Sequence, residues 1–266
     1  MNAINNKEKY LEELTTLGFT IIESAIPKET LEKIKNSLKE ERVFLEKNHK
    51  NDLYRISSFL NSPAHIGFLC PLMDPFCQKD IISSDTLLFL LKNYLGEQNY
   101  LHEYVNNVAL KNTSTSQTPH PDQEYNPNYR VGVVCNFSFS FIDDKNGMTN
   151  IWPKTHNSTV QVHRDILTEY ASIQPSLEPG DMLVRDISLV HQGMPNKSDL
   201  DRYLLALVFK SNNEKIMPYA ISDIPQNFWD TCTNQQKSLL RYHHLVDTQK
   251  VFARCYPAPK ETFEGY

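Results

Sequence analysis

Three residues of the sequence have the types and spacing of a metal site. His120 and Asp122 are separated by one proline, and residues two apart on an extended strand point to the same face. His191 follows 71 positions later (191 − 120), between the apolar pair at 189–190 and the turn at 193–195. Two histidines and one carboxylate bind one face of an iron ion and leave positions open for oxygen and a chelating co-substrate. These ligand types suit Fe(II), and no cysteine adjoins them to indicate zinc or an iron–sulfur cluster.

A fourth residue, Arg202, stands 11 positions after His191 (202 − 191) and begins the apolar run RYLLALVF. A guanidinium at a strand end can point into the same cavity, where it binds a carboxylate through two parallel hydrogen bonds. The alternatives are an ordinary surface arginine and a chance H-x-D pair. His102, His156 and His163 are equally polar and lie near expected strands, and we assign none of them to the metal.

The elements that would position these residues fall into two groups. Residues 1–100 show mostly helical spacing, including a helix opened by Pro27 and another over Asp85–Leu95 that stops at Gly96. After residue 101, short strands alternate with turn residues. The expected strands are 104–110, 130–142, 148–152, 172–177, 181–186 and 202–210. Several short strands with regular turns favour an antiparallel jelly roll.

We therefore predict a mainly β protein with flanking helices and a double-stranded β-helix (jelly roll, cupin-like) core. One domain over residues 1–266 suits this length. Within it, residues 1–100 form a mostly helical support, 101–212 the jelly-roll core, and 213–266 a C-terminal helical extension, because the pattern over 226–244 is again helical.

Composition narrows the class of partner. The net charge of −5 gives no electrostatic footprint for nucleic acid. No apolar run is long enough to span a membrane, and the N-terminus does not resemble a signal peptide. The five cysteines form no CxxC motif, which is typical of reduced thiols. We expect a cytoplasmic protein that acts on a small molecule, with no nucleic-acid or membrane partner.

With these positions in hand, the sequence resembles the phytanoyl-CoA dioxygenase (PhyH) family of Fe(II)/2-oxoglutarate-dependent oxygenases. The likeness lies in the order and spacing of several segments. They are His120-Pro-Asp122 at the H-x-D motif, Asn146-Gly147 through Trp152-Pro-Lys-Thr-His156, Gly180-Asp-Met-Leu-Val-Arg-Asp186, His191-Gln-Gly-Met-Pro-Asn196, and Arg202 at the spacing of the co-substrate arginine. The Trp152 and Arg185-Asp186 segments also resemble the branch that contains the kanamycin B dioxygenase. By analogy, that branch indicates a small polar substrate from specialised metabolism.

The resemblance implies roles for these residues. His120, Asp122 and His191 would be the metal ligands and the catalytic set, and Arg202 would bind the far carboxylate of the co-substrate 2-oxoglutarate. With O2, the products are succinate, CO2 and an oxidised, most simply hydroxylated, substrate. Related halogenases carry a small residue in place of the carboxylate, so Asp122 favours oxygenation. The alternatives are an oxygenase of a protein or peptide residue, or a non-catalytic binding protein of this fold.

Other assignments complete this hypothesis. A second contact to 2-oxoglutarate is expected from the strand before H-x-D, with Asn107 as the candidate and Lys111 or Arg55 as alternatives. Two positions depart from the family pattern: Lys154 replaces a glycine, and Phe139 replaces a tryptophan beside the co-substrate. The remaining expectations are substrate-lining roles for Trp152, Tyr125 and Tyr129, a structural role for His156, and orientation of His191 by Asp181, Arg185 or Asp186.

Overall fold

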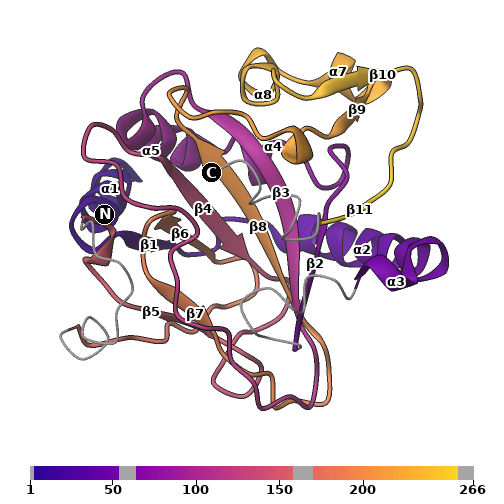
Figure 1. Ribbon diagram of the computed structural model, residues 1–266. Helices are drawn as coiled ribbons and strands as arrows, with labels where there is room; N and C mark the ends of the chain where they lie inside the picture. Colours follow the sequence, from indigo (N-terminus) through magenta and orange to yellow (C-terminus); the bar gives the residue numbers. More distant parts are fainter. Residues whose placement is uncertain (1–2, 54–63, 158–169, 257–266) are drawn as a thin grey trace.

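The computed structural model describes residues 3–53, 64–157 and 170–256. Within these ranges a seven-stranded sheet, here the main sheet, has the strand order β1-β6-β4-β8-β3-β2-β11 (Figure 1). Its strands are β1 (Phe19–Ile22), β2 (His65–Leu69), β3 (Tyr100–Ala109), β4 (Gly132–Phe137), β6 (Met182–Asp186), β8 (Arg202–Lys210) and β11 (Arg254–Cys255). Each neighbouring pair is antiparallel.

A smaller sheet lies over one face of the main sheet. It pairs β5 (Thr149–Ile151) with β7 (His191–Gly193), and isolated bridges at 142, 173, 177 and 196 extend it. Ile142, Met148 and Ile151 from this side pack with Leu183 and Leu204 of the main sheet. The two sheets therefore enclose a common interior, as in a jelly roll.

Helices cover the opposite face of the main sheet (Figure 1). They are α1 (Ala3–Leu17), α2 (Lys28–Asn48), α3 (Lys50–Leu53), α4 (Lys79–Ile82) and α5 (Asp85–Leu95). Their buried residues, such as Leu38 and Leu91, pack with Leu205 and Phe209 of β8. No helix of the described chain is long and apolar enough to cross a membrane. Because side chains alternate along a strand, one face of β8 belongs to this apolar core and the other to the interior.

The main sheet with flanking helices confirms the predicted fold class. Strand β8 has the expected bounds, whereas β4 ends at Phe137, because Ser138 begins a local turn in which its hydroxyl accepts from the Ser140 amide. Residues 172–177 form isolated bridges rather than a strand. Strand β2 was not predicted.

The C-terminal part is less helical than expected. It holds the short helices α7 (Gln226–Thr231) and α8 (Asn234–Leu239), and also β9 (Asp223–Pro225), β10 (His244–Val246) and β11. The helical pattern over 226–244 breaks because Thr233 forms a capping box that starts a new helix. Strand β11 then pairs with β2 and brings Tyr256 to the edge of the interior.

Candidate metal centre

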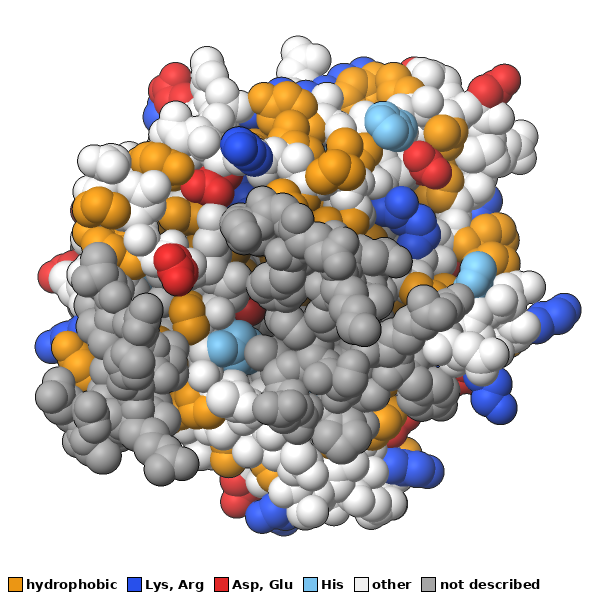
Figure 2. Space-filling view, in the orientation of Figure 1, with side chains coloured by type: hydrophobic (Ala, Val, Ile, Leu, Met, Phe, Trp, Pro, Cys, Tyr) orange, Lys and Arg blue, Asp and Glu red, His pale blue; other side chains and the backbone are white. Residues whose placement is uncertain are grey.

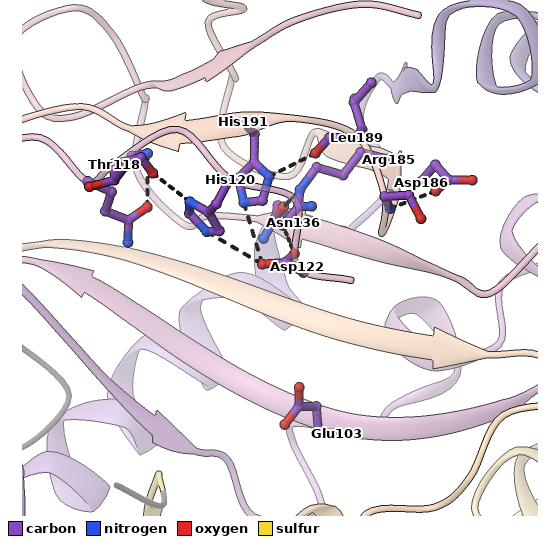
Figure 3. A network of polar contacts seen from close by, with 12 residues as sticks. Glu103, Thr118, His120, Asp122, Asn136, Arg185, Asp186, Leu189 and His191 are labelled. Atoms are coloured by element: carbon purple, nitrogen blue, oxygen red, sulfur yellow. Dashed lines mark hydrogen bonds and ion pairs between the residues drawn. The ribbon is translucent and has the colours of Figure 1, made fainter. Parts of the chain in front are cut away.

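His120, Asp122 and His191 form one compact cluster, here the triad (Figure 3). Each offers one ligand atom, and these atoms lie within 4.8 Å of one another. The Nε2 atoms of His120 and His191 are 3.8 and 3.6 Å from Oδ1 of Asp122. In the space-filling view of this face, one histidine side chain is visible to the left of the centre (Figure 2). The fold therefore brings the predicted ligands together, although His191 is far from the other two in sequence.

Backbone pairing explains why the triad forms. The amide of His120 donates to the carbonyl of His191 over 2.9 Å, and the amide of His191 donates back over 3.0 Å. Asp122 is held by a further bond from its amide to the carbonyl of Ile187. The H-x-D segment thus lies alongside β7, and its two side chains point to the same side, as the period of an extended chain requires.

Each histidine ring is oriented by a backbone carbonyl. Nδ1 of His120 lies 2.7 Å from the carbonyl of Thr118, and Nδ1 of His191 lies 3.0 Å from that of Leu189. A carbonyl only accepts, so Nδ1 is the donor in both rings. Both Nε2 atoms are left with a lone pair that faces Asp122, which is the tautomer that metal coordination needs.

Arg185 on β6 holds the other oxygen of Asp122. Its Nη2 donates to Oδ2 over 2.6 Å, and its Nε donates to Asn136 over 3.3 Å. Burial acts to raise the pKa of Asp122, but the charges of Arg185 and of the two histidines outweigh it and hold that pKa below its usual range. Burial, assisted by Arg185, lowers the pKa of His191 to about 3. The triad is therefore an ionised carboxylate with a neutral imidazole at neutral pH.

Arg202 begins β8 on the interior face and is 4% exposed. Its Nη2 donates to the carbonyl of Gly147 over 2.7 Å, while its buried Nε has no partner. Among the described residues no carboxylate pairs with it. Burial alone lowers its pKa to about 10, so it stays cationic. A buried guanidinium without a counter-ion is costly, and an incoming carboxylate would offset that cost.

Two further residues lie beside Arg202. Ala109 on β3 pairs directly with Arg202. Asn107 lies two positions from Ala109, so its side chain shares the interior face, and it is exposed. His65 on β2 pairs with Ala109. Burial and the charge of Arg202 lower the pKa of His65 to about 4. Asn107 as a second contact for the co-substrate stays a prediction, while His65 escaped sequence reasoning because nothing predicted β2.

The sequence matches the family model of phytanoyl-CoA dioxygenase (PhyH) over residues 15–203. The chain belongs to this family. It is accordingly an enzyme of the 2-oxoglutarate-dependent dioxygenase class, and the family implies dependence on Fe(II) and 2-oxoglutarate. No curated protein matches the sequence significantly.

Solved structures share the family fold at low identity. AviO1 from Streptomyces viridochromogenes Tue57 superposes with a TM-score of 0.60 at 14% identity, over 80% of this chain and 98% of that one. EvdMO1 gives 0.61 at 16%, over 77% of this chain, which spans only 50% of that one. SnoN, a non-heme alpha-ketoglutarate-dependent epimerase from nogalamycin biosynthesis, gives 0.56 at 14%, over 78% and 82%. These similarities show a shared fold.

The structure bears on both departures from the family pattern that the sequence shows. Lys154 has a φ of 71°, a left-handed conformation in which glycine is free of strain, so the usual glycine there has a backbone reason. Phe139 packs against Tyr203, whose side chain lies on the helix-covered face. The structure therefore does not bring Phe139 beside Arg202. Lys111 is exposed, and Arg55 lies outside the described residues.

The three residues expected to line the substrate site lie in different surroundings. Trp152 is buried directly after β5, and Tyr125 is half-buried close to the triad in sequence. The hydroxyl of Tyr129 donates to Glu214 over 2.8 Å. Their roles toward substrate stay predictions, because none contacts the triad through a described hydrogen bond.

The expected orienting residues have distinct roles. Asp186 accepts from Tyr94 over 2.6 Å and from the Ser188 amide over 2.7 Å, which shapes the turn before His191. Asp181 accepts from the amides of Ser24 and Glu178, at the opposite end of β6. Nε2 of His156 lies 3.2 Å from the Thr15 carbonyl of α1. Only Arg185 touches the triad, and it orients Asp122 rather than His191.

Proposed function

We propose that this enzyme holds Fe(II) with His120, Asp122 and His191 and 2-oxoglutarate with Arg202, and that it oxidises a C–H bond of a small molecule, most simply by hydroxylation. Succinate and CO2 would be released with the oxidised product. When bound, iron and 2-oxoglutarate supply the oxidising chemistry, and the chain supplies position and shielding.

The observation that carries this proposal is the unpaired cation of Arg202 on the face of the main sheet that points into the interior, which the smaller sheet with the triad also encloses. A planar guanidinium suits the terminal carboxylate of a dicarboxylate, because it donates two parallel hydrogen bonds. No described carboxylate takes that place, so the site fits an anionic co-substrate rather than a structural ion pair.

The triad fits Fe(II) equally well. Its donors are two imidazole nitrogens and one carboxylate oxygen, which leave room for further ligands on the open side. Arg185 keeps Oδ2 of Asp122 occupied, so Oδ1 is presented with the two Nε2 atoms. The carboxylate fills the place that a halide would need, which supports oxygenation over halogenation.

Two observations support a small-molecule substrate, one from a similar structure and one from the chain itself. SnoN acts in the biosynthesis of nogalamycin, a metabolite rather than a macromolecule. The chain itself carries a net charge of −5, which does not favour nucleic acid. No described feature favours a peptide substrate. We therefore keep it only as an alternative outcome of the test.

Anaerobic addition of Fe(II) and then 2-oxoglutarate tests the cofactor assignment. The wild-type protein should develop the weak visible charge-transfer band of the chelated complex and should form succinate when air is admitted. Asp122→Ala should lose the band, and the exposed Glu124→Gln serves as a matched control that keeps it. A folded wild-type protein without band or succinate would overturn the proposal.

Product mass then tests the reaction. Incubation with candidate metabolites under ¹⁸O₂ should give a product heavier by one labelled oxygen atom. A loss of hydrogen without added oxygen, or inversion without a mass change, would replace hydroxylation by desaturation or epimerisation.

A further inference from the structure

Two buried charged residues toward the opposite end of the interior face from Arg202 have polar atoms without partners. Glu103 on β3 is 8% exposed, and its Oε1 accepts from the hydroxyl of Tyr256 over 3.3 Å, whereas its Oε2 is buried and unpartnered. Lys210 at the end of β8 is 7% exposed, and its amine makes no side-chain hydrogen bond or ion pair with the described residues. Neither residue has a role in the site described above.

Both side chains point to the same face of the main sheet as Arg185, the residue that holds Asp122. Glu103 pairs with Val208, which pairs with Val134, which pairs with Arg185, so these four residues form one row across the sheet. The row spans three strand spacings, roughly 14 Å between backbones. Lys210 follows Val208 by two residues and therefore shares the face. Figure 3 shows Glu103 across from Asp122 and joined to none of the residues around the triad.

Glu103 and Lys210 attract each other across the face but form no ion pair among the described residues, and Glu214 and Asp122 also attract the ammonium of Lys210. Glu103 and Lys210 lie diagonally on neighbouring strands, and their charged atoms do not approach within ion-pair distance among the described contacts. Burial raises the pKa of Glu103 to about 7, and burial lowers the pKa of Lys210 below its usual value. Each charge is therefore held at a cost, which a ligand between them would offset.

The chemistry of that ligand follows from what each group lacks. Oε2 of Glu103 needs a hydrogen-bond donor, and the ammonium of Lys210 needs an acceptor. A hydroxyl group does both, whereas an amine would repel Lys210 and a carboxylate would repel Glu103. The ring of Tyr256 stands beside Glu103, and the ring of Tyr219 packs against that of Tyr256 with centroids 6.0 Å apart, so both add amphipathic surface.

We propose that Glu103 and Lys210 form a substrate subsite for the hydroxyl groups of a polyhydroxylated, sugar-like molecule. This inference rests on the proposed function, because the subsite would anchor one end of the substrate while another part lies beneath the triad. Glu103 and Lys210 act here as specificity-determining residues, with no part in binding iron or 2-oxoglutarate.

The test uses the full chain loaded anaerobically with Fe(II) and 2-oxoglutarate, whose visible band reports the cofactor complex. Glucose, galactose, mannose, maltose and lactose are titrated by calorimetry, each beside its per-O-methylated counterpart, with spermidine as a hydroxyl-free amine. The variants are Glu103→Gln, Glu103→Ala and Lys210→Met, with Glu124→Gln as the exposed control.

At least one free sugar should bind, and its methylated counterpart should bind about tenfold more weakly or worse, as expected for loss of one charge-assisted hydrogen bond. Glu103→Ala and Lys210→Met should each weaken the sugar to a similar degree, and Glu124→Gln should not. If the band forms but no sugar binds, if spermidine binds in preference, or if the variants bind sugar like wild type, this inference fails. Absence of the band in wild type would instead overturn the proposed function.

Discussion

Arg185 and Arg202 are both buried on the interior face of the main sheet, and they differ in what they meet there. Arg185 is 5% exposed and lies 2.6 Å from Oδ2 of Asp122. Arg202 is 4% exposed and donates only to a backbone carbonyl. One guanidinium is therefore paired with a carboxylate of its own chain, and the other has no described counter-ion.

The difference separates a positioning group from a binding group. The charge of Arg185 is neutralised in the folded protein, and its effect passes to the metal through the orientation of Asp122. The charge of Arg202 is neutralised only when a ligand arrives, so its burial gives affinity for that ligand at some expense of stability. The two arginines should therefore respond in opposite ways when their surroundings change.

Asp122→Ala should have the largest effect, because it removes a metal ligand. It also leaves Arg185, like Arg202, as a buried guanidinium without a carboxylate partner. Iron should no longer copurify, turnover should fall below detection, and the free energy of unfolding should drop by about 2 kcal/mol, since a buried cation loses its partner. Added formate should restore part of the iron binding by filling the gap beside Arg185. Iron content after gel filtration measures this, and restoration in the Asp122→Ala, Arg185→Leu double variant would contradict the pairing.

Arg202→Leu should weaken 2-oxoglutarate by about 2–3 kcal/mol, or roughly 30- to 150-fold in KM. Without 2-oxoglutarate, its free energy of unfolding should match or exceed that of wild type, because a buried unpaired cation is gone. Arg202→Lys keeps the positive charge but loses the two parallel hydrogen-bond donors of the guanidinium. The variant therefore separates the contribution of charge from that of geometry. Urea unfolding and steady-state kinetics measure both effects; a clear loss of apoprotein stability would show that Arg202 has an internal partner.

Arg185→Leu should weaken iron by roughly 10- to 100-fold, the usual range for a residue that orients a metal ligand. Its affinity for 2-oxoglutarate, measured at saturating iron, should stay within a factor of about two. Anaerobic iron titration followed by the charge-transfer band separates the two quantities. If 2-oxoglutarate weakened as much as iron, Arg185 would contact the co-substrate.

The smallest effect concerns the pKa of His65, which burial lowers most and the charge of Arg202 lowers further. It should rise from about 4 toward its ordinary value in Arg202→Leu and in the 2-oxoglutarate complex, and should not move in Arg185→Leu. Because the folded pKa lies below the unfolded one, His65 supports the fold fully above about pH 6.5 and loses that contribution as the pH falls through 4. NMR titration of the ring protons is the measurement; an unchanged pKa in Arg202→Leu would contradict the coupling.

Much of the candidate site could be predicted from local sequence. The spacing of His120 and Asp122 forces their side chains to one side of an extended segment, and RYLLALVF marks β8 and the place of Arg202. These are effects of neighbours along the chain, which periodicity detects.

Other features depend on strand order and are invisible in such patterns. The contact of Arg185 with Asp122 needs β6 to lie beneath the H-x-D segment. Glu103 shares the interior face because β3 pairs with β8 in one regular register from Ala109 to Glu103, which places it opposite Val208. His65 comes beside Arg202 only because β2 joins β3 at the far side of the sheet. Sequence reasoning therefore singled out the triad and named Arg185 as an orienting residue, but it assigned Arg185 to His191 rather than Asp122, and it missed Glu103 and His65.

The reciprocal backbone bonds between His120 and His191 have a consequence for the lifetime of a bound metal. Folding has already closed the 71-residue loop between them, so an ion meets its ligands with little further loss of chain entropy. Release of the ion and rupture of this single bridge become linked events. Amide hydrogen exchange at these two residues should then slow on metal binding. Its rate would measure how often the site opens to release the metal.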